Sequence, residues 1–185
     1  MKDIIIKSME EQDIKDVAVI LTDSWKIAYK DIIDKDYLEN LKVEERIEKV
    51  KKEYKDGSYI VAKDIDTNQV IGLSRFGDRI DDLDRFTDYD GEIYGLYVKP
   101  GLLRNGVGSR LLKYAKQELK NKGKSKMILW CLKENSPSRK FYENMGGTLL
   151  GEKTRNIGGK EYSLVGYGYE LKDIWIYIIY LFTRP

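Results

Sequence analysis

Histidine is absent from this sequence of 185 residues, and cysteine occurs only once. Without histidine the chain cannot build a Ser-His-Asp or Cys-His catalytic triad or the usual zinc sites, and we expect no bound metal. The single Cys131 cannot form a disulfide within the chain, and its apolar surroundings indicate a packing residue rather than a nucleophile. Any acid or base that works here must therefore be Asp, Glu, Lys, Tyr, Cys or water.

Long apolar segments are scarce as well. No cationic leader followed by an apolar stretch opens the chain, which together with the lone cysteine favours a cytoplasmic protein. The tail, residues 173–185 (DIWIYIIYLFTRP), has about ten apolar residues, fewer than the ~20 that a helix needs to cross a bilayer. We interpret it as an added strand or a homodimer contact, as an end outside the folded domain, or as a membrane-surface segment.

The charges nearly cancel, with 33 Lys and Arg against 31 Asp and Glu. The net charge of +2 gives no global reason to expect a nucleic acid or an anionic membrane as partner. Hydrophobic residues at 42% and charged residues at 35% are typical of a globular protein. The length fits one domain, which we place at residues 1–172.

Hydrophobic periodicity predicts elements in the order β, α, α, β, β, β, α, β, α, β, β. A β-branched run opens the chain, and apolar residues spaced by three and four then indicate helices. Residues 78–92, which are rich in acids, are interpreted as a loop. The expected strands are residues 2–8, 58–63, 69–76, 92–99, 127–132, 147–154 and 161–171, and the expected helices begin near Asp13, Val43, Val107 and Pro137.

The glycine turn RNGVGS connects a strand that ends at Pro100 to a basic helix. Its backbone N–H groups and the helix N-terminus can hold an anionic phosphate. A Walker loop requires Gly-Lys-Ser or Gly-Lys-Thr and is excluded because Gly108 is followed by Ser109 and Arg110. A Rossmann turn is excluded because Leu111 occupies the position of the third glycine. Two glycines alone also fit a plain tight turn, but the strand, turn and helix context favours a pyrophosphate site.

A second motif begins at Asn135-Ser136-Pro137, a polar cap followed by proline at the first helical position. Ser138 and Tyr142 lie four residues apart on this helix and therefore share a face. The phenol can point between two strands of the sheet, although a core tyrosine beside a core phenylalanine also explains the spacing.

With both motifs in place, the chain resembles the GNAT acetyltransferase superfamily over about residues 2–171. EIYGLYVKPGLLRNGVGSRLL is similar to motif A of the family, and LWCLKENSPSRKFYENMGG is similar to motif B. The resemblance implies an α/β (α+β) fold with a mixed, mostly antiparallel twisted sheet of about six to seven strands and about four helices. It also implies an N-acetyltransferase that moves the acetyl group of acetyl-CoA to a primary amine by direct attack in a ternary complex.

The resemblance also implies roles for individual residues. Tyr142 is expected to be the general acid, and the backbone of Leu96, Tyr97 and Val98 is expected to pair with pantetheine. The family usually has Gln or Arg where Leu103 stands and glycine where Arg104 stands, so one guanidinium contact is displaced or lost. The cofactor site is completed by Arg104, Asn105, Gly106, Val107, Gly108, Ser109, Asn135, Ser138 and Tyr142.

Aminolysis of a thioester requires a neutral amine, yet an alkyl amine with a pKa near ~10.4 is almost fully protonated at pH 7. Glu92, on the strand that leads into the turn, is the candidate base. An ordinary carboxylate with a pKa near ~4.3 is too weak for direct transfer, so either burial raises its pKa or a water relay carries the proton. Tyr94, on the same face two residues later, is the alternative relay.

The acceptor is less defined by the sequence. Residues 78–92 carry seven acids and two arginines, and this net charge of −5 would attract a polyamine, a lysine side chain or a protein N-terminus. Trp25, Tyr29 and Tyr37 lie in a segment similar to the acceptor-side helices of some GNAT members and are candidates to line the amine pocket. A solvated acidic loop and core packing of Trp25 are the alternatives. A non-catalytic acyl-CoA-binding sensor or interaction module is the other function that the sequence permits.

Overall fold

The computed structural model describes residues 3–80 and 86–171, which form seven strands, five α-helices and two short 3₁₀ helices. Every strand and helix expected from the sequence is present within a few residues of its expected bounds. The strands are β1 Ile4–Ser8, β2 Tyr59–Asp64, β3 Val70–Asp78, β4 Gly91–Val98, β5 Lys126–Leu132, β6 Thr148–Ile157 and β7 Lys160–Glu170. The helices are α1 Ile14–Ala28, α2 Lys35–Glu39, α3 Val43–Glu53, α4 Val107–Asn121 and α5 Ser136–Asn144, with 3₁₀ turns at Glu11–Asp13 and Tyr54–Asp56.

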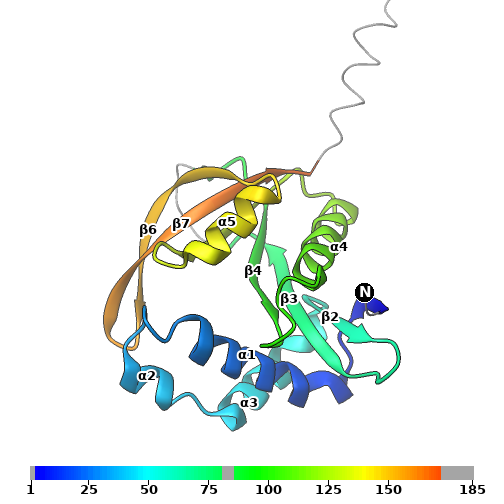
Figure 1. Cartoon of the computed structure of the whole chain (residues 1–185). Coiled ribbons are helices and arrows are strands. Elements are labelled where there is room, and N and C mark those ends of the chain that lie inside the picture. The colour runs from blue at the N-terminus through cyan, green and yellow to red at the C-terminus, as the bar shows by residue number, and fades with distance from the viewer. Residues whose placement is uncertain (1–2, 81–85, 172–185) are drawn as a thin grey trace, which may run out of the picture.

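The strands form one sheet in the order β1-β2-β3-β4-β5-β7-β6. Among the strands of residues 3–80 and 86–171, only β4 and β5 run parallel, and the other neighbours are antiparallel. This confirms the predicted mixed, mostly antiparallel sheet. The parallel pair is joined through α4, because parallel neighbours need a crossover connection. Figure 1 shows α4 along this crossover and the long β6–β7 hairpin at the other side of the sheet.

Helices cover both faces of the sheet. Val107 and Leu111 of α4 approach Gly72 of β3 and belong to the largest hydrophobic cluster, which also includes Tyr142 of α5. The next residue of β3, Leu73, points to the opposite face and packs in a second cluster with α1 and α3. Because neighbouring residues of a strand face opposite sides, a strand that is covered on both sides is apolar throughout. These two clusters explain the apolar run Tyr59 to Ala62 of β2, whose last two residues, Lys63 and Asp64, are buried as well.

The short helix α2 was not predicted from the sequence. It has five residues, too few for a helical period to be visible. Asp34 caps it by accepting the Tyr37 N–H at 3.1 Å, and the Asp34 N–H donates to the Tyr162 hydroxyl of β7 at 2.9 Å. Ile33 and Leu38 pack against Ile157 in a third cluster. The α1–α2 segment is therefore fastened to the β6–β7 hairpin.

Two parts of the sequence-based interpretation lie outside the described residues. One is the apolar tail, and the other is the part of the acidic segment that contains Asp81, Asp82 and Asp84. Within residues 3–80 and 86–171, no helix has both the length and the apolar character that a membrane crossing requires.

Candidate active site

The two parallel strands separate soon after they meet. Their pairing covers only Gly91–Ile93 of β4 and Met127–Leu129 of β5. From Tyr94 onward β4 has no neighbouring strand on its β5 side within the described part of the chain, while its other edge stays paired with β3. An unpaired strand edge offers N–H and C=O groups to an extended ligand. Leu96, Tyr97 and Val98, which the sequence assigned to pantetheine, lie on this open edge.

A β-bulge lies where β4 leaves β5. Arg75 of β3 faces Gly95, but the next residue, Phe76, faces Ile93, so Tyr94 is an extra residue in β4. A bulge changes which side of the sheet the following side chains face. As a result, Ile93, Leu96 and Val98 contact the cluster under α4, whereas Glu92, Gly95 and Tyr97 lie on the α1 face.

The glycine turn ends directly on α4. Gly106 caps the helix in the left-handed region with φ 78°, and Val107 is the first helical residue. The N–H groups of the first turn have no partner within a helix and can bind an anion. A Cβ at Gly108 would lie 3.4 Å from Phe141 Cζ and 3.6 Å from Leu96 Cδ2. The turn is thus next to both the open edge of β4 and helix α5, which brings the two sequence motifs together.

Arg104 is held in the left-handed region with φ 64°, a conformation that favours glycine. This conformation costs an L-residue about 1–2 kcal/mol, of which the greater flexibility of glycine in the unfolded chain offsets about 0.5–1 kcal/mol. We expect Arg104→Gly to raise the free energy of unfolding by about 0.5–1 kcal/mol in urea titrations. Arg110→Gly, on the exposed side of α4, is the control and should lower it by about 1 kcal/mol. A loss of stability in Arg104→Gly would contradict the strain.

Asn135 is buried at the N-terminus of α5, with 6% of its surface exposed. Its Oδ1 accepts the Ser138 N–H at 3.2 Å and so caps the helix, as its position before Pro137 predicts. Its Nδ2 makes no hydrogen bond to the residues that the structure describes. A buried amide with donors to spare, held just after the end of β5 by the hydrogen bond from the Asn135 N–H to the Leu132 carbonyl, fits a contact to the amide oxygens of pantetheine.

Tyr142 of α5 packs in the same hydrophobic cluster as Ile93 of β4 and Cys131 of β5. Only 8% of its surface is exposed, and its ring lies 5.3 Å from Phe141 and 5.9 Å from Tyr167. Its backbone carbonyl accepts the Tyr169 hydroxyl at 2.8 Å, while its own hydroxyl has no hydrogen-bond partner among the described residues. Burial, followed by the neighbouring Cys131, raises the pKa of Tyr142. The hydroxyl therefore keeps its proton and suits a donor.

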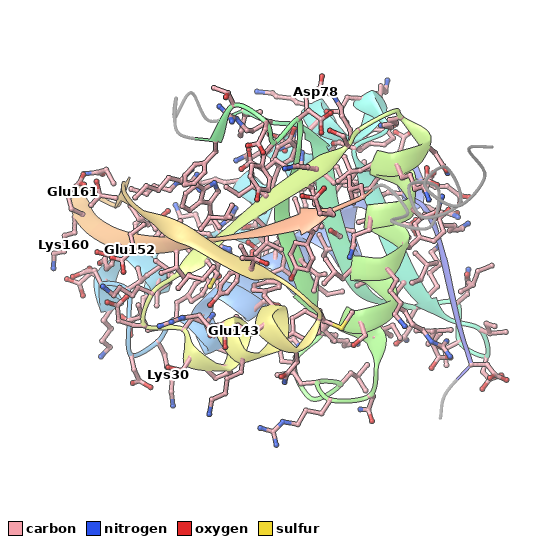
Figure 2. All side chains as sticks on the ribbon, turned by 90° about the horizontal axis from the view of Figure 1, so that it is seen from above. Lys30, Asp78, Glu143, Glu152, Lys160 and Glu161 are labelled. Atoms are coloured by element: carbon pink, nitrogen blue, oxygen red, sulfur yellow. The ribbon has the colours of Figure 1, made fainter. Side chains whose placement is uncertain are left out.

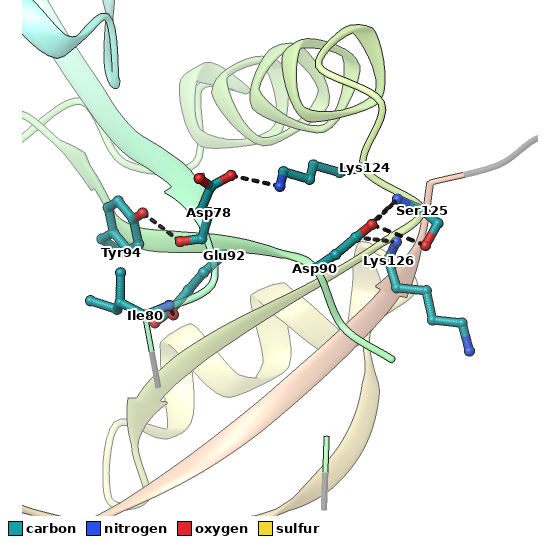
Figure 3. Close-up of polar contacts among 8 residues, drawn as sticks. All are labelled: Asp78, Ile80, Asp90, Glu92, Tyr94, Lys124, Ser125 and Lys126. Carbon is teal, nitrogen blue, oxygen red and sulfur yellow. Dashed lines mark hydrogen bonds and ion pairs between the residues drawn. The ribbon is translucent and has the colours of Figure 1, made fainter. Parts of the chain in front are cut away.

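Glu92 and Tyr94 lie together in the first half of β4, near the β3–β4 connection (Figure 3). Glu92 is buried, and its Oε2 accepts the Ile80 N–H at 3.0 Å. Tyr94 donates its hydroxyl to the Asp78 carbonyl at 2.6 Å. Burial raises the pKa of Tyr94, and the nearby Glu92 raises it further. The hydroxyl of Tyr94 thus keeps its proton and is already engaged, which leaves the carboxylate of Glu92 as the candidate base of the pair.

The acidic segment carries less free charge than its sequence indicates. Asp78 pairs with Lys124 at 2.6 Å, and Asp88 pairs with Lys126 at 2.7 Å. Asp90 accepts the Ser125 N–H at 2.9 Å and the Lys126 N–H at 3.0 Å, which ties the start of β5 to β4 (Figure 3). The hydrogen bond from Lys124 lowers the pKa of Asp78. These three carboxylates hold the α4–β5 connection and attract an amine only weakly.

The aromatic residues assigned to the acceptor divide into two places. Trp25 and Tyr29 of the α1 end are in edge contact, with ring centroids 5.2 Å apart, and Trp25 reaches β4. Tyr37 instead packs against Gly158 in the β6–β7 turn. Figure 2 shows Lys160 and Glu161 at this far end of the hairpin, well away from Asp78. Only Trp25 and Tyr29 are therefore placed beside the open edge of β4.

Two other side chains bear on the chemistry. Cys131 of β5 is buried, and burial raises the pKa of its thiol to about 12, so it is not a thiolate near neutral pH. The sequence used Tyr97 only for its backbone, but its side chain contacts Trp25 on the α1 face. The sequence does not reveal this contact, because strict alternation along β4 places Tyr97 and Glu92 on opposite faces of the sheet, and only the bulge brings them to the same face.

Comparison with known proteins agrees with this geometry. The model of the acetyltransferase (GNAT) family matches residues 23–147. The uncharacterized N-acetyltransferase YuaI of Bacillus subtilis is 32% identical over 166 residues, covering 90% of this chain and 92% of YuaI. The solved structure of the PaiA N-acetyltransferase of Thermoplasma acidophilum in complex with coenzyme A is 22% identical, with a TM-score of 0.66, over 91% of this chain and 99% of that one. YncA of Salmonella typhimurium, solved with its cofactor acetyl-CoA, is 20% identical with a TM-score of 0.69, over 92% and 95% of the two chains.

Proposed function

The chain belongs to the acetyltransferase (GNAT) family, and we propose that it transfers the acetyl group of acetyl-CoA to a primary amine by direct attack in a ternary complex. The observation that carries this proposal is the separation of β4 from β5, with the buried Tyr142 packed in the same cluster as Ile93 of β4 and Cys131 of β5. This separation gives an extended thioester an open strand edge on one side and a proton donor on the other.

The residues around the open edge fit acetyl-CoA. Backbone groups of Leu96 to Val98 face no strand on that side in the described ranges, and Asn135 has buried amide donors to spare. The first-turn N–H groups of α4 suit the pyrophosphate. Leu103 is exposed and apolar and cannot replace the usual cation, but the neighbouring Arg104 is exposed and can supply one. When bound, acetyl-CoA supplies the activated acyl group, and the chain supplies position and proton transfer.

We assign removal of the amine proton to Glu92 through water. Glu92 is four residues before Leu96, and at ~3.3 Å per residue this places them about 13 Å apart along β4. No glutamate side chain spans that gap, so a carboxylate at Glu92 cannot touch an amine that attacks a thioester next to Leu96. The water relay is therefore preferred over direct proton transfer.

The departing thiolate receives its proton from Tyr142 in this proposal. In water a phenol with a pKa of ~10 is a slightly weaker acid than a thiol with a pKa of ~8.5. Burial raises the pKa of Tyr142, but the same apolar surroundings also raise the pKa of the thiol by disfavouring the thiolate. The difference between the two pKa values therefore grows less than the pKa of Tyr142 itself. A backbone N–H of the Leu96 to Val98 strand can polarise the thioester carbonyl.

Release of CoA thiol across a panel of amines tests this function. The panel contains spermidine, n-butylamine, a peptide with a free lysine side chain and a peptide with a free N-terminus. We expect amine-dependent thiol release with at least one of them, above the rate with acetyl-CoA alone. The alternative function, a non-catalytic acyl-CoA sensor, predicts acetyl-CoA binding in a calorimetric titration with no thiol release for any amine.

A further inference from the structure

The ring of Tyr97 folds back along β4 over Gly95. A Cβ at position 95 would lie 2.6 Å from Tyr97 Cε2 and 3.1 Å from its hydroxyl oxygen. Any side chain larger than hydrogen at position 95 would push the ring away. The hydroxyl of Tyr97 is consequently displaced from its own Cα toward the beginning of β4, where Glu92 lies.

Trp25 fixes the orientation of this hydroxyl. Its Nε1 donates a hydrogen bond of 3.2 Å to the Tyr97 hydroxyl oxygen. The indole is itself held by the edge of Tyr29 at 5.2 Å and by the guanidinium of Arg46 at 5.1 Å. Indole N–H is only a donor, so the O–H of Tyr97 must point elsewhere. Within the described residues no second partner takes that proton.

The position of the hydroxyl lies between the two ends of the proposed proton path. Leu96 marks the place of the thioester, and Glu92 is the distant base. Because of the bulge at Tyr94, Gly95 and Tyr97 lie on the same face as Glu92. The titratable and charged groups near the Trp25, Tyr29 and Tyr97 side chains include Tyr142 on α5, Cys131 on β5, Arg155 on β6 and Arg46 on α3, while Arg75 on β3 faces Gly95 and Glu92 lies at the start of β4. Within β4, Gly91–Val98, Glu92 is the only carboxylate.

We propose that the Tyr97 hydroxyl relays the proton of the attacking amine toward Glu92 and that Trp25 is the positioning residue for this relay. This inference rests on the proposed function. As the N–H bond of the ammonium breaks, the Tyr97 oxygen accepts that proton and gives its own to a water that leads to Glu92. Tyr97 is neutral before and after the step, and the carboxylate of Glu92 takes up the proton and later releases it to solvent.

Tyr97→Phe tests the relay because it removes the hydroxyl and keeps the ring over Gly95. With the best amine of the panel, we expect kcat/KM at pH 7 to fall about 10-fold to 100-fold, with the KM for acetyl-CoA changed by less than about 2-fold. The loss should shrink as the pH approaches the pKa of the amine, since the amine then arrives neutral. A loss of equal size at every pH, or no loss, would overturn the proposal. Tyr54→Phe, on the same face of the sheet but outside the site, is the matched control and should keep full activity.

Trp25→Phe distinguishes a positioned relay from a general effect of the aromatic cluster. We expect Trp25→Phe to lower kcat/KM by about 3-fold to 10-fold when Tyr97 is present and to have almost no effect when it is added to the Tyr97→Phe variant. Independent losses that multiply in the double variant would show that Trp25 does not act through Tyr97. If the unchanged protein releases no thiol with any amine, the proposed function fails and the relay with it. If it does release thiol and Tyr97→Phe matches it, only the relay fails.

Discussion

Tyr142→Phe is expected to lower kcat by about 10²-fold and to leave the KM for acetyl-CoA within about 2-fold of its original value. The phenylalanine retains the ring contacts with Phe141 and Tyr167 and loses only the proton donor. Because the hydroxyl is buried without a hydrogen-bond partner among the described residues, its removal should not reduce the melting temperature. Unchanged turnover at saturating substrates would remove Tyr142 from the mechanism.

Tyr167→Phe is the matched control for this variant. The Tyr167 hydroxyl donates to Glu143 at 2.7 Å and accepts from Arg139 at 3.2 Å, so its removal deletes two hydrogen bonds to charged groups. We expect a stability loss of about 1–3 kcal/mol in urea titrations with kcat within about 2-fold. The two variants should therefore show opposite patterns, with activity lost in one and stability lost in the other.

The direction of the Tyr142 pKa predicts the pH profile. The hydroxyl acts as an acid only in its protonated form, and burial raises its pKa, so that form persists to higher pH than for an exposed tyrosine. We expect kcat to show no decline between pH 7 and about pH 10 that depends on Tyr142. A fall in kcat near pH 8 to 9 that disappears in Tyr142→Phe would show that the pKa is lowered instead.

The largest effect on stability is expected from Lys63→Met. The Lys63 ammonium on β2 lies 2.5 Å from the Asp13 carboxylate, and only 3% of each side chain is exposed. Removing one partner of a buried pair leaves an uncompensated charge and typically costs about 3–5 kcal/mol. We expect a loss of this size in the free energy of unfolding in urea titrations. Such a loss places the variant near the limit of folding for a protein of ordinary stability.

Two comparisons separate pairing from general damage to the core. The double variant Lys63→Met with Asp13→Leu removes both charges and should recover most of the loss, because apolar pairs often replace buried ion pairs at little cost. The exposed pair Lys35 and Glu39 is the surface control, and Lys35→Met should change stability by less than about 0.5 kcal/mol. If Lys63→Met behaves like Lys35→Met, the buried ion pair contributes nothing.

Much of the fold could be predicted because its elements carry strong local signals. The apolar runs of β2 and β5, the helical spacing of α1 and α4, and the Asn-Ser-Pro start of α5 each appear in the sequence at the right place. Helix α2 carried no such signal, since its stability comes from Asp34 and from contacts with the β6–β7 hairpin about 120 residues later. The buried pairing of Lys63 with Asp13 is also a tertiary contact that no local pattern indicates.

The site was predictable in its motifs but not in its geometry. Motif spacing named Tyr142, Asn135 and the glycine turn, and the structure brings the glycine turn next to Leu96 of β4 and Phe141 of α5. The bulge at Tyr94 was not predictable, because it depends on pairing with β3. The bulge decides which side chains share a face with Glu92. Strict alternation along the strand places Tyr94 on that face and Tyr97 on the other, so the sequence indicated Tyr94 as a relay and gave no role to the side chain of Tyr97.

Simultaneous measurement of both products tests acetyl transfer most directly. The protein, acetyl-CoA and the best amine of the panel are incubated together, and free CoA, acetylated amine and intact protein are quantified by mass spectrometry. Direct attack in a ternary complex predicts equal amounts of CoA and acetylated amine, with no acetyl group on the protein at any time. CoA release without acetylated amine, or an acetylated protein that precedes the product, would contradict it.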